Sequence, residues 1–222
     1  MEVLKTFRHE YKFVIPYEEM LRLREKLDDL LTLDQGGSYV VRSLYLDSCD
    51  DVDYYDKLHG EMIRKKIRLR IYDINSDKVK LELKGKYDYH QLKESLVINK
   101  KDAKKIIDGD YSVLLEYDND LAKRLYVYLM EGYRPKVIIE YDRVAYITST
   151  TTRITFDFNI KRSCDFEKFF TNEINYYNVV DGKDVVLEVK FDRFLEPYIS
   201  KILNNYVGRY QSVSKYMMGR NV

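Results

Sequence analysis

The sequence predicts an α+β fold in which consecutive strands form an antiparallel sheet or a closed antiparallel β-barrel, with helices packed outside. About seven or eight segments alternate polar and apolar residues, as half-buried strands do. Most of these segments follow one another across short polar turns, which is typical of antiparallel neighbours. Amphipathic helical segments lie between and after them. Nine glycines and three prolines do not cluster, and no repeat is visible, so we expect a single domain over residues 1–222.

The composition narrows the class of protein. Of the 222 residues, 45% are hydrophobic and 34% are charged, which supports a real core and argues against global disorder. The net charge of +1 argues against a general nucleic-acid binder. Two cysteines without a CxxC motif suit a reducing compartment. Neither a secretory leader nor an apolar run of membrane-spanning length is visible, so we expect a soluble, cytoplasmic protein.

The N-terminal part begins with a strand over residues 6–15, where aromatic and β-branched residues alternate with charged ones. Pro16, a residue tolerated in the first turn of a helix, precedes leucines at helical spacing up to residue 31. Residues 38–47 are rich in β-forming residues and predict a second strand. Residues 51–58 predict a short helix.

A hairpin follows, because the alternating segments 61–73 and 77–86 are separated by turn-forming residues. Residues 90–98 predict another strand, and 100–108 and 120–131 predict helices. The remaining elements are expected as strands over 134–147, 152–160 and 183–191, and as helical or irregular segments over 195–206 and 212–219.

The segment "EMIRKKIRLRIYD" (61–73) has an unusual polar face. Alternate residues of a strand point to opposite faces, so one face carries Arg64, Lys66, Arg68 and Arg70, opposite Ile67, Leu69 and Ile71. Like charges on one face destabilise a strand unless something neutralises them. A polyanionic ligand is one candidate. The alternatives are a half-solvated sheet with its charges in water, or cross-strand ion pairs with Glu82 or Glu140.

Other strands repeat the pattern. Cations and a few acids share a face in four further strands: Arg8, Glu10 and Lys12; Lys78, Lys80, Glu82, Lys84 and Lys86; Arg153, Thr155 and Asp157; Glu188 and Lys190. If the sheet closes, these faces converge on one lumen. Arginine and lysine suit phosphate oxygens, and glutamate among them suits a hard divalent cation. Phosphoryl transfer needs little beyond positioning and charge neutralisation.

Short motifs in a fixed order carry a family resemblance: "FRHEYKF", "RSLYLD", "IRLRIYD", "LELKGK", "IEYDRVAY", "RITFD", "LEVKF" and "SVSKYMMG". Over roughly residues 6–219 the chain resembles the polyphosphate polymerase domain of the vacuolar transporter chaperone (VTC) family. That domain belongs to the triphosphate tunnel metalloenzyme (CYTH-like) superfamily. The resemblance implies a closed antiparallel tunnel that binds ATP and a growing polyphosphate chain, assisted by Mn²⁺ or Mg²⁺.

The resemblance also implies roles for individual residues. The phosphate-contacting, catalytic cations would be Lys12, Arg68, Arg70, Lys84, Arg143, Arg153, Lys190 and Lys215. Glu188 would hold the metal, with Glu10 as a second candidate. Further substrate-binding residues would be Tyr141 and Ser214, which lie nearby, Arg64 and Lys66, which continue the cationic face, and Lys57, where the family usually has arginine.

Two departures bear on the activity. Tunnel triphosphatases carry an E-x-E-x-K signature on the first strand, and here Arg8 stands where the first glutamate should be. This favours a polymerase over a triphosphatase. A non-catalytic module that binds polyphosphate or nucleotide stays open as well. The chain has no membrane segment of the kind found in yeast-type members, so the resemblance allows a separate membrane protein as partner and a peripheral location.

Overall fold

Several strands follow one another along the chain, with helices between and after them, as predicted. The computed structural model describes residues 8–87, 90–148, 152–179, 183–206 and 209–220. The chain divides into two units by its contacts. Unit 1 comprises Met1–Val40, Tyr141–Ile160 and Val180–Ser214, and unit 2 comprises Val41–Glu140, Lys161–Val179 and Lys215–Val222. The single domain expected from the sequence stays a prediction.

The strands are β1 (Arg8–Pro16), β2 (Thr32–Asp47), β3 (Ile63–Ile71), β4 (Lys78–Tyr87), β5 (His90–Asn99), β6 (Arg134–Ile147), β7 (Arg153–Ser163), β8 (Tyr177–Asn178) and β9 (Asp184–Asp192). The α-helices are α1 (Tyr17–Asp28), α2 (Val52–His59), α3 (Lys100–Ile107), α4 (Asp120–Met130), α5 (Pro197–Leu203) and α6 (Lys215–Arg220). Three short 3₁₀ helices are η1 (Ser112–Glu116), η2 (Phe166–Lys168) and η3 (Asn204–Tyr206).

Most predicted boundaries lie within a few residues of these. Two differ more. Helix α1 ends at Asp28 rather than residue 31, and Leu30 beyond it is exposed. Strand β2 begins at Thr32, six residues before the predicted start at residue 38, because Gly36 and Gly37 are poor strand formers and hide the extended conformation from propensity. The two-residue strand β8 was not predicted, since it is too short to show alternation.

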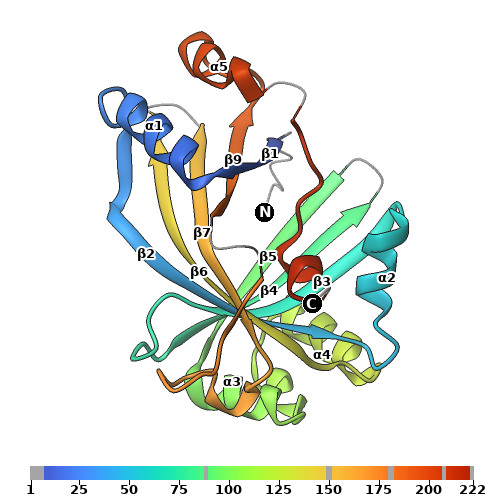
Figure 1. The fold of residues 1–222 in the computed structure, drawn as a ribbon. Coiled ribbons are helices and arrows are strands. Elements are labelled where there is room, and N and C mark those ends of the chain that lie inside the picture. The colour runs from blue at the N-terminus through green and yellow to red at the C-terminus, as the bar shows by residue number, and fades with distance from the viewer. Residues whose placement is uncertain (1–7, 88–89, 149–151, 180–182, 207–208, 221–222) are drawn as a thin grey trace. The chain divides into compact units, whose positions relative to one another are not determined.

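In unit 1, the strand order is β1-β9-β7-β6-β2. Strands β1, β9 and β7 lie side by side and antiparallel (Figure 1). Their apolar faces form one core with helices α1 and α5, as expected for helices packed outside. This core includes Phe13, Ile15, Met20, Leu23, Leu27, Phe156, Leu187, Val189, Ile199 and Leu203.

In unit 2, the strand order is β7-β6-β2-β3-β4-β5, and β8 pairs with β7. Strands β3 and β4 form the predicted antiparallel hairpin, and Asp73 accepts a hydrogen bond from the Asn75 amide in its turn at 2.8 Å. Helices α3 and α4 cover the apolar face of the strands (Figure 1). That core includes Leu69, Leu81, Leu83, Leu96, Ala103, Ile106 and Leu125.

The antiparallel α+β fold is therefore present, and helices cover the apolar sheet face in each unit. Among the described residues, the order of paired strands has β1 and β5 as its ends, so these pairings do not confirm a closed barrel. Closure stays a prediction. No helix in the described part of the chain is long and apolar enough to cross a membrane.

Candidate functional site

The register of unit 2 sets like charges opposite each other. Strands β3 and β4 pair Arg64 with Lys86, Lys66 with Lys84, and Arg70 with Lys80, whereas Arg68 lies opposite Glu82. Strand β5 adds Lys93 opposite Lys84. Directly opposed like charges destabilise a sheet. The polar face of these strands therefore concentrates positive charge, and it carries more cations than carboxylates.

Arg68 and Arg70 are buried, at 9% and 6% exposure. The interpretation that their charges lie in water is therefore wrong. The ion pairing considered from the sequence is present: Arg68 donates to Glu82 Oε2 over 2.6 Å, and Arg70 Nη1 lies 3.8 Å from the same atom. Lys93 Nζ lies 2.6 Å from Glu82 Oε1. Three cations thus share one carboxylate.

Glu82 is fully buried. Burial alone would raise its pKa, but the charges of Arg68, Arg70 and Lys93 outweigh burial and hold the pKa well below its usual range. Glu82 is consequently ionised at neutral pH. Its single negative charge leaves the group of three cations with an excess of positive charge, which suits an anionic ligand.

Strand β2 contributes residues that the sequence analysis did not single out. Ser43 lies opposite Arg70 and accepts from its Nε at 3.0 Å, while Tyr45 lies opposite Arg68 and accepts from Nη1 at 3.2 Å. Burial would raise the pKa of Tyr45, but the charges of Arg68, Arg70 and Lys66 lower it to about 8. A signal was available, because Ser43, Tyr45 and Asp47 alternate with leucines.

The other predicted residues of unit 2 have contacts or positions of their own. Lys66 Nζ is 5.2 Å from the centroid of the Tyr216 ring. Arg64 donates to the Glu61 carbonyl over 2.7 Å near the start of β3. Lys84 is half-buried on β4 opposite Lys66. Lys57 lies in α2 and Lys215 is the first residue of α6, and both are half-buried.

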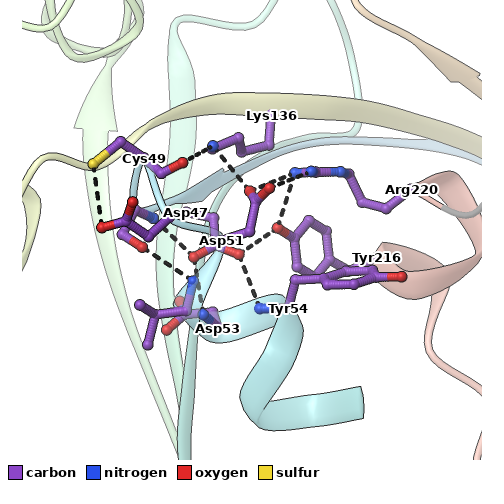
Figure 2. A network of polar contacts seen from close by, with 11 residues as sticks. Asp47, Cys49, Asp51, Asp53, Tyr54, Lys136, Tyr216 and Arg220 are labelled. Carbon is purple, nitrogen blue, oxygen red and sulfur yellow. Dashed lines mark hydrogen bonds and ion pairs between the residues drawn. The ribbon is translucent and has the colours of Figure 1, made fainter.

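A second polar network in unit 2 joins α2 and α6 (Figure 2). The Asp47 carboxylate accepts hydrogen bonds from the backbone amides of Asp53 and Tyr54, each at 2.9 Å, and from the Tyr216 hydroxyl. Arg220 donates to both Asp51 oxygens, at 2.9 and 2.7 Å. These carboxylates have structural partners: Asp47 caps the N-terminus of α2, and both acids hold α6. The Tyr216 ring stacks on Tyr45 at 5.2 Å, so α6 adjoins the polar face.

Unit 1 arranges its charges differently. Strands β1 and β9 pair Lys12 with Glu188 and Glu10 with Lys190, so opposite charges face each other. Lys190 Nζ lies 2.6 Å from Glu188 Oε1 and 3.2 Å from Glu10 Oε1, and Lys12 Nζ lies 3.4 Å from Glu10 Oε2. Burial would lower the pKa of Lys190, but Glu188 and Glu10 raise it, so the amine stays charged. The two predicted metal ligands are thus brought together around one lysine.

Two arginines of unit 1 have carboxylate partners of their own. Arg143 forms a bidentate pair with Asp157, at 2.6 and 2.7 Å, and donates to the Tyr141 hydroxyl at 3.3 Å. Burial would lower the pKa of Arg143, but Asp157 raises it above its usual range. Arg153 Nη2 lies 2.6 Å from Asp34. Ser214, the last residue of unit 1, is half-buried, and Tyr141 is buried.

Comparisons with known proteins agree with the order of motifs. A family model described as the VTC domain matches residues 7–222. No curated protein sequence matches the chain. Among solved structures, a Hippeastrum protein named as an adenylyl cyclase, with a dominant triphosphatase activity, has 15% identity and a TM-score of 0.57 over 95% of this chain and 94% of that one. A Bacillus halodurans protein named as an adenylate cyclase has 14% identity and a TM-score of 0.56 over 92% of each chain. These likenesses concern the fold.

Proposed function

The chain belongs to the VTC domain family, and from this premise we propose that it is a metal-dependent polyphosphate polymerase. It transfers the terminal phosphoryl group of ATP to a growing polyphosphate chain. The proposal includes the closed antiparallel barrel implied by the sequence resemblance, with the polar strand faces inside. ATP and polyphosphate are then the partners. We also propose a cytoplasmic location, peripheral to a membrane and beside a separate membrane protein.

The observation that carries this proposal is the like-charge register of β3 and β4. Arg64, Lys66 and Arg70 each lie opposite a lysine, and the buried Arg68 and Arg70 share the single charge of Glu82 with the exposed Lys93. A polyanion offsets such an excess of positive charge, and a linear phosphate chain carries at least one negative charge on each phosphate unit. Arginine guanidinium groups match phosphate oxygens bidentately, which gives orientation as well as charge.

The same groups have a role in the transfer step. Phosphoryl transfer depends on holding the attacking and leaving oxygens in line and on offsetting charge at the transferred group. Arg68 and Arg70 would bind phosphoryl oxygens in unit 2, and Lys84, Lys66 and Lys215 would add charge. In unit 1, Lys12, Arg143, Arg153 and Lys190 would exchange part of their present carboxylate contacts for phosphate oxygens.

The donor set of unit 1 fits a hard divalent cation. No group of three or more His, Cys, Asp or Glu side chains that could hold a metal exists among the residues the structure describes. Mg²⁺ sites in phosphoryl-transfer enzymes commonly need only one or two carboxylates, because water and substrate phosphates complete the coordination. Glu188 and Glu10, both bound to Lys190, would supply these carboxylates. A bound Mn²⁺ or Mg²⁺ ion would offset the charge that develops on the transferred phosphoryl group.

A tunnel triphosphatase is the second candidate, and the activity named for the Hippeastrum protein is the observation that favours it. In that reaction, water would attack the transferred phosphoryl group, whereas in the polymerase the terminal phosphate of the polymer attacks it. Arg8, in place of the first glutamate of the triphosphatase signature, favours the polymerase.

Product analysis tests the proposal. The protein is incubated with ATP and Mn²⁺, and the products are separated by size. We expect long polyphosphate; orthophosphate alone would establish the triphosphatase instead, and binding of tripolyphosphate without any product would establish a non-catalytic module.

Arg70→Ala should lower the rate by roughly a hundredfold or more, as loss of a charge-stabilising donor does. Its fold should survive, because Glu82 keeps Arg68 and Lys93 as partners. The matched control is Arg124→Ala, since Arg124 of α4 is exposed and pairs with Glu94. The control should keep full activity. Full activity in Arg70→Ala would contradict the assigned site.

A further inference from the structure

We propose that the Thr155 hydroxyl is an oxygen ligand of the divalent cation that Glu188 holds. The inference rests on the proposed function, because it concerns the same metal. It adds a neutral oxygen ligand from β7 to the carboxylates of β1 and β9. Thr155, Glu188 and Glu10 all belong to unit 1, and their three strands lie side by side (Figure 1).

The first observation is an unsatisfied hydroxyl. Thr155 is 3% exposed, and its Oγ1 atom has no hydrogen-bond partner within the described residues. A buried hydroxyl without a partner costs free energy, because it has lost its hydrogen bonds to water. Valine has nearly the same shape and would avoid this cost. The hydroxyl therefore calls for a partner that is not a protein group.

A nearby threonine shows how the fold satisfies such a group. Thr152 is buried to the same degree, at 2% exposure. Its hydroxyl donates to Glu196 Oε2 over 2.6 Å. The two threonines are three positions apart in the chain and belong to the same unit. One hydroxyl has a carboxylate partner, and the other lies on the polar face of β7 between Arg153 and Asp157.

The second observation is the register of β7 and β9. Thr155 lies directly opposite Glu188, and Arg153 lies opposite Lys190. Directly opposed side chains in an antiparallel pair have Cβ atoms about 4.5–5.5 Å apart, on the same face. The Thr155 hydroxyl and the Glu188 carboxylate can therefore reach one ion.

The charge of the neighbours selects a cation over a phosphate as the partner of Thr155. Its opposite residue is a carboxylate, which repels phosphate and attracts a metal ion. Glu10 binds the same lysine as Glu188 and adds a second carboxylate. Hard cations such as Mn²⁺ and Mg²⁺ prefer oxygen ligands, including neutral ones. Phosphate oxygens would instead contact the cations Arg153 and Lys190.

The test uses Thr155→Val and Mn²⁺ alone, without nucleotide. Free Mn²⁺ is titrated by its electron paramagnetic resonance signal to obtain the dissociation constant. We expect the variant to bind Mn²⁺ about tenfold more weakly, as loss of a supporting group at a metal site does. Without metal, its melting temperature should equal or exceed that of the wild type. Thr155→Ser keeps the hydroxyl and should bind Mn²⁺ almost as the wild type does.

Thr152→Val is the matched control. It removes a hydroxyl that Glu196 uses, so it should lower the melting temperature and leave Mn²⁺ affinity unchanged. If Thr155→Val binds Mn²⁺ like the wild type, or loses as much thermal stability as Thr152→Val without metal, the inference is wrong.

Glu188→Gln separates this inference from the proposed function. If Glu188→Gln weakens Mn²⁺ binding and Thr155→Val does not, only the role of Thr155 is wrong. If neither variant changes Mn²⁺ affinity, the metal site itself is wrong and the inference is overturned with it.

Discussion

The two units build polar sheet faces from similar strands but distribute charge in opposite ways. In unit 1, cations of the polar faces contact separate carboxylates: Lys190 contacts Glu188, Arg143 contacts Asp157, and Arg153 contacts Asp34. In unit 2, three cations share Glu82. The register decides this difference, since β1 and β9 oppose lysine to glutamate, whereas β3 and β4 oppose lysine to lysine or arginine.

This difference indicates where a bound anion would contribute most to stability. The cations Lys190, Arg143 and Arg153 of unit 1 already have carboxylate partners, so a bound phosphate must compete with carboxylates there. The face of unit 2 carries a surplus, so an anion relieves repulsion as it binds. We therefore expect ligand-dependent stability to reside mainly in unit 2, and metal dependence mainly in unit 1.

The largest expected effect comes from Glu82→Gln. Removing one partner of a buried ion pair leaves uncompensated charge, and such changes cost about 3–5 kcal/mol. Tripolyphosphate should return a larger share of stability to this variant than to the wild type, because it supplies the missing negative charge. Urea denaturation with and without tripolyphosphate measures both effects. An equal response to tripolyphosphate in the two proteins would remove unit 2 as the anion site.

A smaller, pH-dependent effect is expected from Tyr45→Phe. The pKa of Tyr45 is about 8 in the folded protein against 10.0 for an ordinary tyrosine. The folded state therefore loses the proton first, and the stability from the phenolate is present above pH 10 and lost as pH falls through 8. A difference of two pKa units between the folded and unfolded states corresponds to about 2.7 kcal/mol of unfolding free energy.

The measurement is the unfolding free energy of wild type and Tyr45→Phe between pH 7 and 10. The groups that face the Tyr45 phenol are Arg68, Arg70 and Lys66 of β3 and Tyr216 of α6. The pKa of Tyr216 is raised by burial and by Asp47. The difference between the two proteins should grow with pH in favour of the wild type. A difference independent of pH would mean that the cations do not act on Tyr45 in solution.

The smallest effect is expected from Glu10→Gln in unit 1. Lys190 keeps Glu188 at 2.6 Å, and the contacts of Glu10 are longer and partly exposed. Such pairs are worth less than about 1 kcal/mol. Tripolyphosphate should stabilise this variant and the wild type equally. A loss as large as that of Glu82→Gln, measured in the same urea experiment, would abolish the distinction between the two faces.

The alternation of residues predicted the strands and their faces well, because period-two patterns depend only on the chain itself. It brought Arg68 and Arg70 to one face and identified Glu82 as a possible partner. It did not predict the register, which decides whether a lysine meets glutamate or another lysine. Pairing depends on hydrophobic packing and turns across the whole sheet.

Some partners are too distant in the chain for sequence reasoning. Arg42 lies on the same side of β2 as Leu44 and Leu46, where a charge is unexpected. It is buried, and it donates to the carbonyls of Phe169 and Thr171 and to Glu140. These contacts provide hydrogen-bond acceptors for the buried guanidinium group, so Arg42 has a structural role. Likewise, only the folded structure distinguishes the hydrogen-bonded hydroxyl of Thr152 from that of Thr155.

The Asp47 carboxylate accepts hydrogen bonds from two backbone amides of α2 and from the Tyr216 hydroxyl of α6. Helix α6 begins more than a hundred residues later in the chain. One carboxylate therefore constrains two helices whose sequences could otherwise drift independently. During evolution, replacement of this aspartate would disturb both helices together. Changes at positions 47 and 216 should consequently occur together in related sequences, and a change at only one of them would destabilise helix α6.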